Sequence, residues 1–243
     1  MRKRSAATRE VLLSAAAEAF EQSGFGETRL EDVVAGHDVS KGALYFHFPS
    51  KEALAAAVID AAYGPWPERL ELLRPAYPRA MARLVALGRQ IIDAYRSDAG
   101  MRAGLRLMTE VSSATPALAR PLVDGLAAVE GLLAEAAEQG DLLPGTDVRR
   151  TARLILAGFT GLPRIPGRGN EPAPSADAPD PLVPAERTDV TERADVTELA
   201  ELAELTELAD DMTGLWLALL PGLVRDECRA ELTSVLTGDH PSS

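Results

Sequence analysis

Two Ser-Lys pairs, at residues 40–41 and 50–51, divide one stretch of this sequence into short helical pieces. Serine is a preferred N-cap residue, because its side-chain oxygen accepts a hydrogen bond from a free amide of the first helical turn. The block GALYFHFP lies between the two pairs and ends in a proline, which interrupts a helix. We therefore predict a short helix that begins at Lys41 and a longer one, KEALAAAVIDAAY, that begins at Lys51 and stops at the breaker GPWP.

The residues before this stretch predict two further helices. Apolar side chains recur at helical spacing over residues 6–22, and Gly24 ends that run. In the segment TRLEDVVAG that follows, Thr28 has the position of an N-cap and Glu31 the position that completes a capping box. This second helix is short, and a tight turn at residues 37–39 (His-Asp-Val) leads from it to the first Ser-Lys pair.

Two short helices joined by a tight turn, after a longer supporting helix, form a helix-turn-helix motif, whose last helix presents its N-terminal end to the major groove of DNA. Ser40, Lys41 and Gly42 lie at that end. Lys41 can reach a phosphate or a guanine edge, and Gly42 allows close approach of the backbone. Tyr45 lies on the same face, and its hydroxyl can reach a phosphate. Lys51 and the free amides beside it form a second anion-binding end.

Each of these residues also has an interpretation that needs no DNA. Lys41 and Tyr45 could be solvated surface residues, and Lys51 a solvated helix end. Thr28 is first of all a helix cap, whose hydroxyl or amide can also touch a phosphate. His47 either contacts a phosphate or caps local backbone. The remaining large side chains of the block are predicted to be core: Leu44, Phe46 and Phe48.

The sequence from about residue 68 to 162 keeps a helical pattern between glycine and proline breaks. Its apolar side chains recur at helical spacing, which is typical of helices in a bundle. The strongly apolar segment DMTGLWLALLPGLV and a final helix follow near the end of the chain. The helices predicted here cover residues 79–96, 100–113, 117–139, 147–162, 211–224 and 225–237.

Charge is segregated along the chain, and this decides how the net charge of −12 is interpreted. Residues 164–211 hold thirteen Asp or Glu and four Arg, a net of −9, so only −3 remains for the rest. Residues 2–9 carry four basic side chains before the first acid, and could follow a DNA backbone or only keep the terminus soluble. Residues 163–206 are rich in Pro, Gly, Ala and acid, and we expect them to be a disordered acidic insertion.

The sequence offers little for catalysis. No metal-ligand spacing, glycine-rich phosphate loop or nucleophile elbow is present, so we expect no enzyme, no cofactor and no metal site. The single cysteine, Cys228, has no histidine near it in sequence and is expected to be a structural thiol of a cytoplasmic protein. No stretch approaches the roughly 18 unbroken apolar residues of a membrane span, so no membrane contact is expected.

The segment TRLEDVVAGHDVSKGALYFHFPSKEAL resembles the DNA-binding region of TetR-type repressors. KGALYFHF with SKEAL is most similar to the γ-butyrolactone autoregulator receptors of antibiotic-producing actinobacteria. SDAGMRAGLRLMTE, EQGDLLPGTDVRRTARLILAGFTG and DMTGLWLALLPGL also resemble that subgroup. The similarity covers residues 5–162 and 208–225. Matched to the motif, the DNA-facing set is Thr28, Lys41, Gly42, Tyr45, His47 and Lys51, with Leu44 and Phe48 as packing positions.

The resemblance implies an all-α homodimer with an N-terminal three-helix helix-turn-helix domain over residues 1–50. Residues 51–243 would then form a helical ligand-binding and dimerisation bundle. A small-molecule inducer in the bundle changes the spacing of the two DNA-binding ends, so that the dimer leaves a palindromic operator. The few charges of the candidate lining favour a mostly apolar ligand. The residues expected to line its site are Met101, Leu105, Met108, Leu126, Val129, Phe159 and Trp216.

Three departures separate the chain from the subgroup. The turn at residues 37–39 lacks the usual glycine, and the insertion at 163–206 is not typical. Receptors that bind butyrolactones usually carry a tryptophan in the helix corresponding to PLVDGLAAVEGLL, where this chain has Gly125. The expected ligand is therefore a butyrolactone-type signal, an antibiotic or a biosynthetic intermediate, and the regulated genes those of secondary metabolism or efflux. The alternative is a helical small-molecule-binding or interaction protein without DNA recognition.

Overall fold

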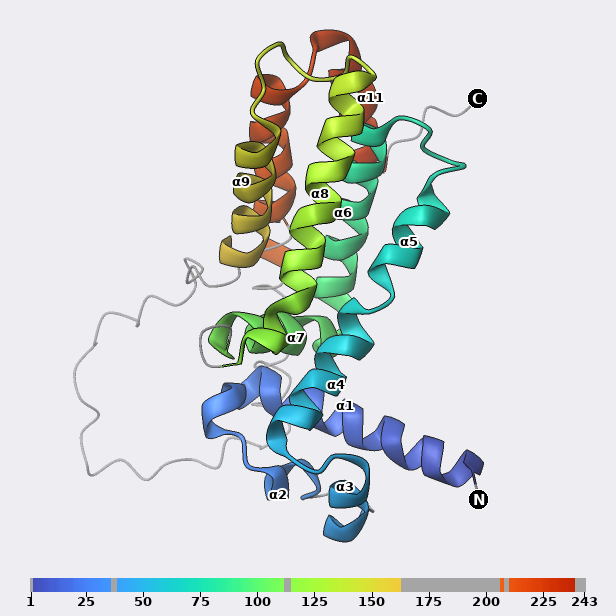
Figure 1. The fold of residues 1–243 in the computed structure, drawn as a ribbon, viewed down its shortest axis with the longest axis vertical. Coiled ribbons are helices and arrows are strands. Elements are labelled where there is room, and N and C mark those ends of the chain that lie inside the picture. Colours follow the sequence, from blue (N-terminus) through green and yellow to red (C-terminus); the bar gives the residue numbers. More distant parts are fainter. Residues whose placement is uncertain (1, 36–38, 112–114, 163–205, 208–209, 239–243) are drawn as a thin grey trace, which may run out of the picture.

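The computed structural model describes residues 2–35, 39–111, 115–162, 206–207 and 210–238. These residues are almost entirely helical and contain no strand beyond an isolated bridge between Leu142 and Val224 (Figure 1). The helices are α1 (Arg2–Glu27), α2 (Leu30–Val33), α3 (Lys41–His47), α4 (Lys51–Tyr63), α5 (Trp66–Leu73), α6 (Ala80–Ser97), α7 (Ala99–Val111), the 3-10 helix η1 (Pro116–Ala119), α8 (Arg120–Glu138), α9 (Val148–Gly161), helical residues 210–223, and α11 (Asp226–Thr237).

The helices form two groups that meet at α7. Helices α1 to α4, here called the head, lie at one end of the molecule (Figure 1). Helices α6, α8, α9, α11 and residues 210–223 run roughly side by side and form the bundle. Helix α7 lies across the end of the bundle and packs against α1 and α4 of the head. The predicted all-α fold with an N-terminal helix-turn-helix and a helical bundle is confirmed.

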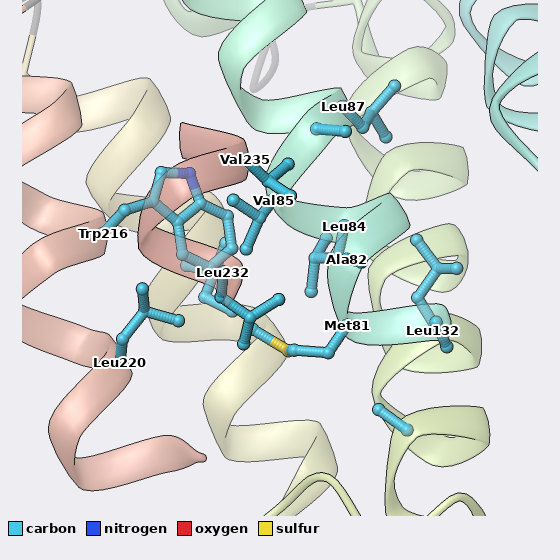
Figure 2. Close-up of a cluster of buried hydrophobic side chains, with 14 of the residues drawn as sticks. Met81, Ala82, Leu84, Val85, Leu87, Leu132, Trp216, Leu220, Leu232 and Val235 are labelled. Atoms are coloured by element: carbon cyan, nitrogen blue, oxygen red, sulfur yellow. The ribbon is translucent and has the colours of Figure 1, made fainter. Parts of the chain in front are cut away.

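Two apolar clusters hold these groups together. The bundle cluster joins α6 to α8, α11 and residues 210–223, with Trp216 turned toward α6 (Figure 2). The head cluster contains Leu12, Phe20 and Leu44 of the head, but Leu107 and Met108 of α7 belong to it too and are fully buried. The core of the head is therefore completed by a helix from beyond it in the sequence.

Both predicted serine caps are confirmed. The Ser40 hydroxyl accepts a hydrogen bond from the Ala43 amide at 3.2 Å, and the Ser50 hydroxyl accepts one from the Ala53 amide at 3.1 Å. The predicted capping box at Thr28 is wrong. Helix α2 has no side-chain cap, because the Thr28 hydroxyl instead donates to the carbonyl oxygens of α1 residues Ala19 and Gly24.

The prediction that Phe46 belongs to the core is also wrong. Its side chain is 80% exposed, whereas Leu44 and Phe48 are buried as predicted. A residue two places beyond Leu44 on a helix is rotated by about 200° from it, and therefore faces away from the core. Helical periodicity alone predicts that Phe46 is exposed, whereas the apolar character of phenylalanine predicts that it is buried.

The helix bounds differ from the prediction at three places. Helix α1 continues to Glu27, although its backbone departs from helical geometry at Gly24, with φ 71°. The GPWP segment ends α4 but also begins α5, because proline is well tolerated in the first turn of a helix. A 3-10 turn precedes α8. The turn residues His37 and Asp38, and the acidic insertion except for Thr206, lie outside the described residues.

Within the part of the chain that the structure describes, every helix is too short or too polar to cross a membrane.

Candidate DNA-binding surface and ligand cavity

The N-terminal end of α3, here called the α3 tip (Ser40, Lys41, Gly42 and Tyr45), lies on the surface of the head. The Lys41 ammonium is 3.0 Å from the Glu31 carboxylate, and both side chains are about 60% exposed. Exposed ion pairs of this kind contribute at most about 1 kcal/mol, so Lys41 can exchange Glu31 for another anion at little cost. Tyr45 is half exposed on the next turn of the helix.

Gly42 has no role in the packing of the head. A Cβ atom placed there would meet only the Ser40 hydroxyl, at an ordinary contact distance of 3.8 Å. Glycine inside a helix costs up to about 1 kcal/mol relative to alanine. The fold of the chain therefore does not account for glycine at this position, whereas close approach of an external molecule would.

Phe46 extends this surface beyond the predicted residues, and the predicted residue His47 lies beside it. The exposed Phe46 ring meets the edge of the His47 ring, with 5.2 Å between their centroids. His47 is half-buried in the last turn of α3 and also lies beside Phe48. Phe46 and Tyr45 are thus both exposed on α3, and an apolar ring there can contact sugar or base methyl groups.

Thr28 and Lys51 occupy structural positions. Thr28 is buried, and its hydroxyl bonds to α1. The Lys51 ammonium donates to the carbonyl oxygens of Phe25, Gly26 and Thr28, and lies 4.5 Å from the centre of the Phe25 ring. All three of its hydrogens are therefore directed at the end of α1, so that Lys51 ties the start of α4 to α1.

A set of charged side chains, here called the clasp, joins Arg102, Arg106 and Glu110 of α7 to Glu21 and the same end of α1. Arg102 pairs with Glu21, and Arg106 donates to the Glu21 carbonyl oxygen at 2.5 Å. Arg106 also pairs with Glu110, whose other oxygen accepts the Phe25 amide at 2.8 Å. The clasp thus binds free backbone groups of α1 where the helix kinks.

Gly24 makes the clasp possible. Its φ of 71° is left-handed, and a Cβ atom there would lie 2.7 Å from a Glu110 carboxylate oxygen and 2.8 Å from Arg106. Any side chain at Gly24 would therefore strain the backbone and displace the two residues of the clasp at once.

An apolar cavity of about 100 Å³ lies in the bundle, next to the head. Helices α4, α6, α7, α8, α9 and residues 210–223 all contribute to its wall, and most of the contributed side chains are aliphatic or aromatic. The lining residues are Tyr63, Leu84, Leu87, Gly88, Ile91, Tyr95, Leu105, Leu122, Val129, Ile155, Leu156, Phe159, Thr160, Met212 and Trp216.

A second, more polar cavity of about 310 Å³ adjoins the first. Tyr95, Leu105 and Thr160 line both, and the rest of its wall consists of the clasp residues and Thr109. A molecule that extends from one cavity to the other would thus touch the apolar bundle core at one end and the clasp at the other.

The predicted ligand residues fall into two groups. Leu105, Val129, Phe159 and Trp216 line the apolar cavity. Met101 and Met108 are buried but do not line it, and Leu126 packs against the bundle core. The lining from α4 and α6 was missed, since a helix in the middle of a bundle has apolar residues on several sides and its sequence does not mark the side that borders a cavity.

Gly125 lies on the side of α8 that borders the cavity, between the lining residues Leu122 and Val129. A Cβ atom at Gly125 would meet nothing within 4 Å. The chain therefore has open space at the position where the resemblance implies a tryptophan. In the described part of the chain, no group of three or more His, Cys, Asp or Glu side chains is placed to hold a metal ion.

Residues 12–58 match the family described as bacterial regulatory proteins, tetR family. The match spans α1 to α4 and includes the whole α3 tip. The chain belongs to the TetR family. A solved structure described as a γ-butyrolactone receptor (ArpA-like protein) superposes with a TM-score of 0.72 at 22% identity and covers 97% of each chain.

Further relatives place this TetR-family protein with the butyrolactone-receptor type. It is 33% identical to the A-factor receptor protein of Streptomyces griseus over 160 residues, which is 65% of this chain and 55% of that protein. The chain therefore spans about half the length of this curated relative. The structure of CprB from Streptomyces coelicolor in complex with its biological operator sequence has a TM-score of 0.71 at 24% identity, covering 97% of each chain.

We predict that Gly24→Ala lowers the free energy of unfolding by about 1–3 kcal/mol, because alanine is strained at this φ and displaces Glu110. Chemical denaturation followed by circular dichroism measures this. Gly26→Ala is the matched control, since a Cβ atom there meets nothing within 4 Å. Equal stability of the two variants would contradict the role given to Gly24.

Proposed function

We propose that this chain is a ligand-responsive transcriptional repressor, which binds a palindromic operator as a homodimer and is released by a small, mostly apolar molecule. Residues 1–50 present the DNA-binding surface, and residues 51–243 bind ligand and the second copy. The inducer is a butyrolactone-type signal, an antibiotic or a biosynthetic intermediate, and the regulated genes serve secondary metabolism or efflux. The TetR-family relatives, which are regulators and not enzymes, support this class of function.

The observation that carries the proposal is the double position of Leu105. Its side chain packs in the head core and also lines both cavities. A ligand that displaces Leu105 therefore acts on the packing of the head directly. The clasp offers a second connection, because the same cavity residues Arg102 and Arg106 hold the end of α1. Ligand can release the protein from DNA only if it binds one arrangement of the head better than the other.

On DNA, the α3 tip makes the contacts in this proposal. Lys41 binds a phosphate or a guanine edge, the Tyr45 hydroxyl binds a phosphate, and the exposed Ser40–Gly42 backbone approaches the groove closely. His47 lies at the edge of the contact. Thr28 and Lys51 act mainly by holding α1, α2 and α4 in place, and the Lys51 backbone amide, in the first turn of α4, can also bind a phosphate.

Two exposed leucines support a site for the second copy. Leu154 of α9 and Leu217 are 55% and 43% exposed. The two segments that carry them pack closely, since a Cβ atom at Gly158 would lie 2.3 Å from the Leu215 side chain. We propose that a second copy covers this face through a two-fold contact, which would place two α3 tips about one turn of DNA apart.

We predict that Lys41→Ala weakens operator binding. In a plot of log affinity against log salt concentration, the slope should become shallower by about 1 for each head. Fluorescence anisotropy with a palindromic fragment from the flanking DNA measures both quantities. Glu31→Gln is the matched variant, since it frees Lys41 from its ion pair and should bind at least as tightly as the wild type. If Lys41→Ala binds the operator with unchanged affinity at several salt concentrations, Lys41 does not contact DNA. If the wild-type protein binds no operator, the alternative is favoured: a helical small-molecule-binding or interaction protein without DNA recognition.

We predict opposite effects of Gly42→Ala on folding and on binding. Alanine should raise stability by up to about 1 kcal/mol, because it favours the helix and fits without contact strain. It should weaken operator binding at least several-fold, because a methyl group would separate α3 from the groove. Thermal melting and the same anisotropy assay measure the two effects, and a variant that binds DNA as well as the wild type would refute close backbone approach.

We predict that Leu217→Glu converts the dimer to a monomer, because an unpaired carboxylate would be buried in the proposed contact. Analytical ultracentrifugation measures the change. Leu72→Glu is the control, since Leu72 is 71% exposed on α5, away from this face. A dimer that persists in Leu217→Glu and dissociates in Leu72→Glu would place the contact elsewhere.

A further inference from the structure

The indole nitrogen of Trp216 is a buried hydrogen-bond donor without a partner. The side chain is 1% exposed and extends from residues 210–223 toward α6 (Figure 2). Its Nε1 atom is one of four buried side-chain polar atoms in the described residues that have no hydrogen bond; the others belong to Arg83, Asp141 and Arg229. Of these four residues, only Trp216 lines the apolar cavity. Buried donors are nearly always paired, so this one requires an explanation.

The space beside this nitrogen exists because residue 88 is glycine. A Cβ atom at Gly88 would lie only 2.5 Å from Nε1 of Trp216. Gly88 itself lines the cavity. Any larger residue would therefore press against the indole nitrogen from the α6 side. The indole ring is held from another side by Phe159, whose ring meets it edge-on with centroids 5.9 Å apart.

Two hydroxyl groups on the cavity wall are already engaged within the chain. The Tyr63 hydroxyl donates to the Met101 carbonyl oxygen at 3.1 Å, and burial raises its pKa, so that it keeps its proton. The Thr160 hydroxyl donates to the Leu156 carbonyl oxygen at 2.9 Å. Tyr95 lies at the boundary with the second cavity. Tyr95 thus offers its hydroxyl toward the polar cavity, and Trp216 is the donor available beside Gly88.

We infer that Trp216 is a specificity-determining residue, whose indole N–H donates to an oxygen atom carried within the apolar part of the ligand. The ligand class is a mostly hydrocarbon molecule with a carbonyl, ether or hydroxyl oxygen placed beside Gly88. This inference rests on the proposed function of the cavity as a ligand site. A molecule of the same shape without the oxygen leaves the donor unpaired and binds less well.

Two probes of matched shape test the inference: cyclohexanone, which has an acceptor, and methylenecyclohexane, which has none. Full-length protein labelled with ¹⁵N in its two tryptophans gives two indole signals, which Trp66→Phe assigns. The Trp216 indole proton should move downfield as cyclohexanone binds, and should not do so with the hydrocarbon. Trp66 is an internal control, because its indole already donates to the Ala62 carbonyl oxygen at 2.9 Å.

The variant Trp216→Phe keeps an aromatic ring beside Phe159 and removes only the donor. With binding followed on the ¹³C-methyl signal of Met212, which also lines the cavity, cyclohexanone should bind about three- to tenfold more weakly than to the wild type. The affinity for methylenecyclohexane should change much less. If this variant does not fold, the comparison of the two probes on the wild-type protein still decides.

Saturation of the Met212 signal by cyclohexanone without a downfield shift at Trp216 would overturn the inference, and so would equal indole shifts with both probes. Operator binding is measured separately on the same preparation, without the probes. If the Trp216 indole proton does not shift with cyclohexanone in a protein that binds its operator, only the role of Trp216 is refuted. If the Trp216 indole proton shifts with cyclohexanone in a protein that binds no operator, the proposed repressor function is refuted and the role of Trp216 is supported.

Discussion

The structure depends on the apolar contact between α7 and the head. Leu107 and Met108 of α7 are fully buried among head residues, and burial of such a side chain contributes about 1.5–3 kcal/mol. Helices α1 to α4 alone are too few to enclose a core of this size, since small domains bury a small share of their surface. Removal of α7 would therefore expose apolar side chains of the head to water. A boundary drawn after residue 50 therefore does not separate two independent cores.

Apolar contact holds the parts together but hardly specifies their angle, because hydrophobic attraction is not directional. Direction comes from the clasp and from Lys51, which approach the end of α1 from different helices. Both bind carbonyl or amide groups that the kink at Gly24 leaves without helical partners. The orientation of the head is thus determined by charged hydrogen bonds, and the polar cavity gives a ligand access to part of them.

Sequence reasoning predicted what depends on local chemistry and missed what depends on packing. The two serine caps and the short helices between them follow from hydrogen bonding within one turn, and both are confirmed. Thr28 has equally good local chemistry, but α1 supplies carbonyl groups that its hydroxyl bonds instead. Nothing in the sequence around Lys51 indicates that the end of α1 lies within reach of its ammonium.

The wall of the apolar cavity could likewise be predicted only in part from the sequence. Four of its wall residues could be named from their place in the bundle helices, but Gly88 and Tyr63 could not. Gly88 matters because of a ring contributed more than a hundred residues later in the chain, and such a pairing is visible only once α6 and residues 210–223 are side by side. Phe46 is a different case: the period of the helix contained the answer, and residue type was given too much weight.

The shared position of Leu105 has a practical consequence for anyone who wishes to turn this protein into a biosensor. Mutagenesis aimed at a new effector would treat Leu105 as one more wall residue to vary. Because the same side chain fills the core beneath α1 and α4, each replacement would also reset the basal level of the reporter. Under the proposed function, sensitivity and background leakiness are therefore coupled at Leu105, and they can be tuned separately only at wall residues outside the head core, such as Val129 or Phe159.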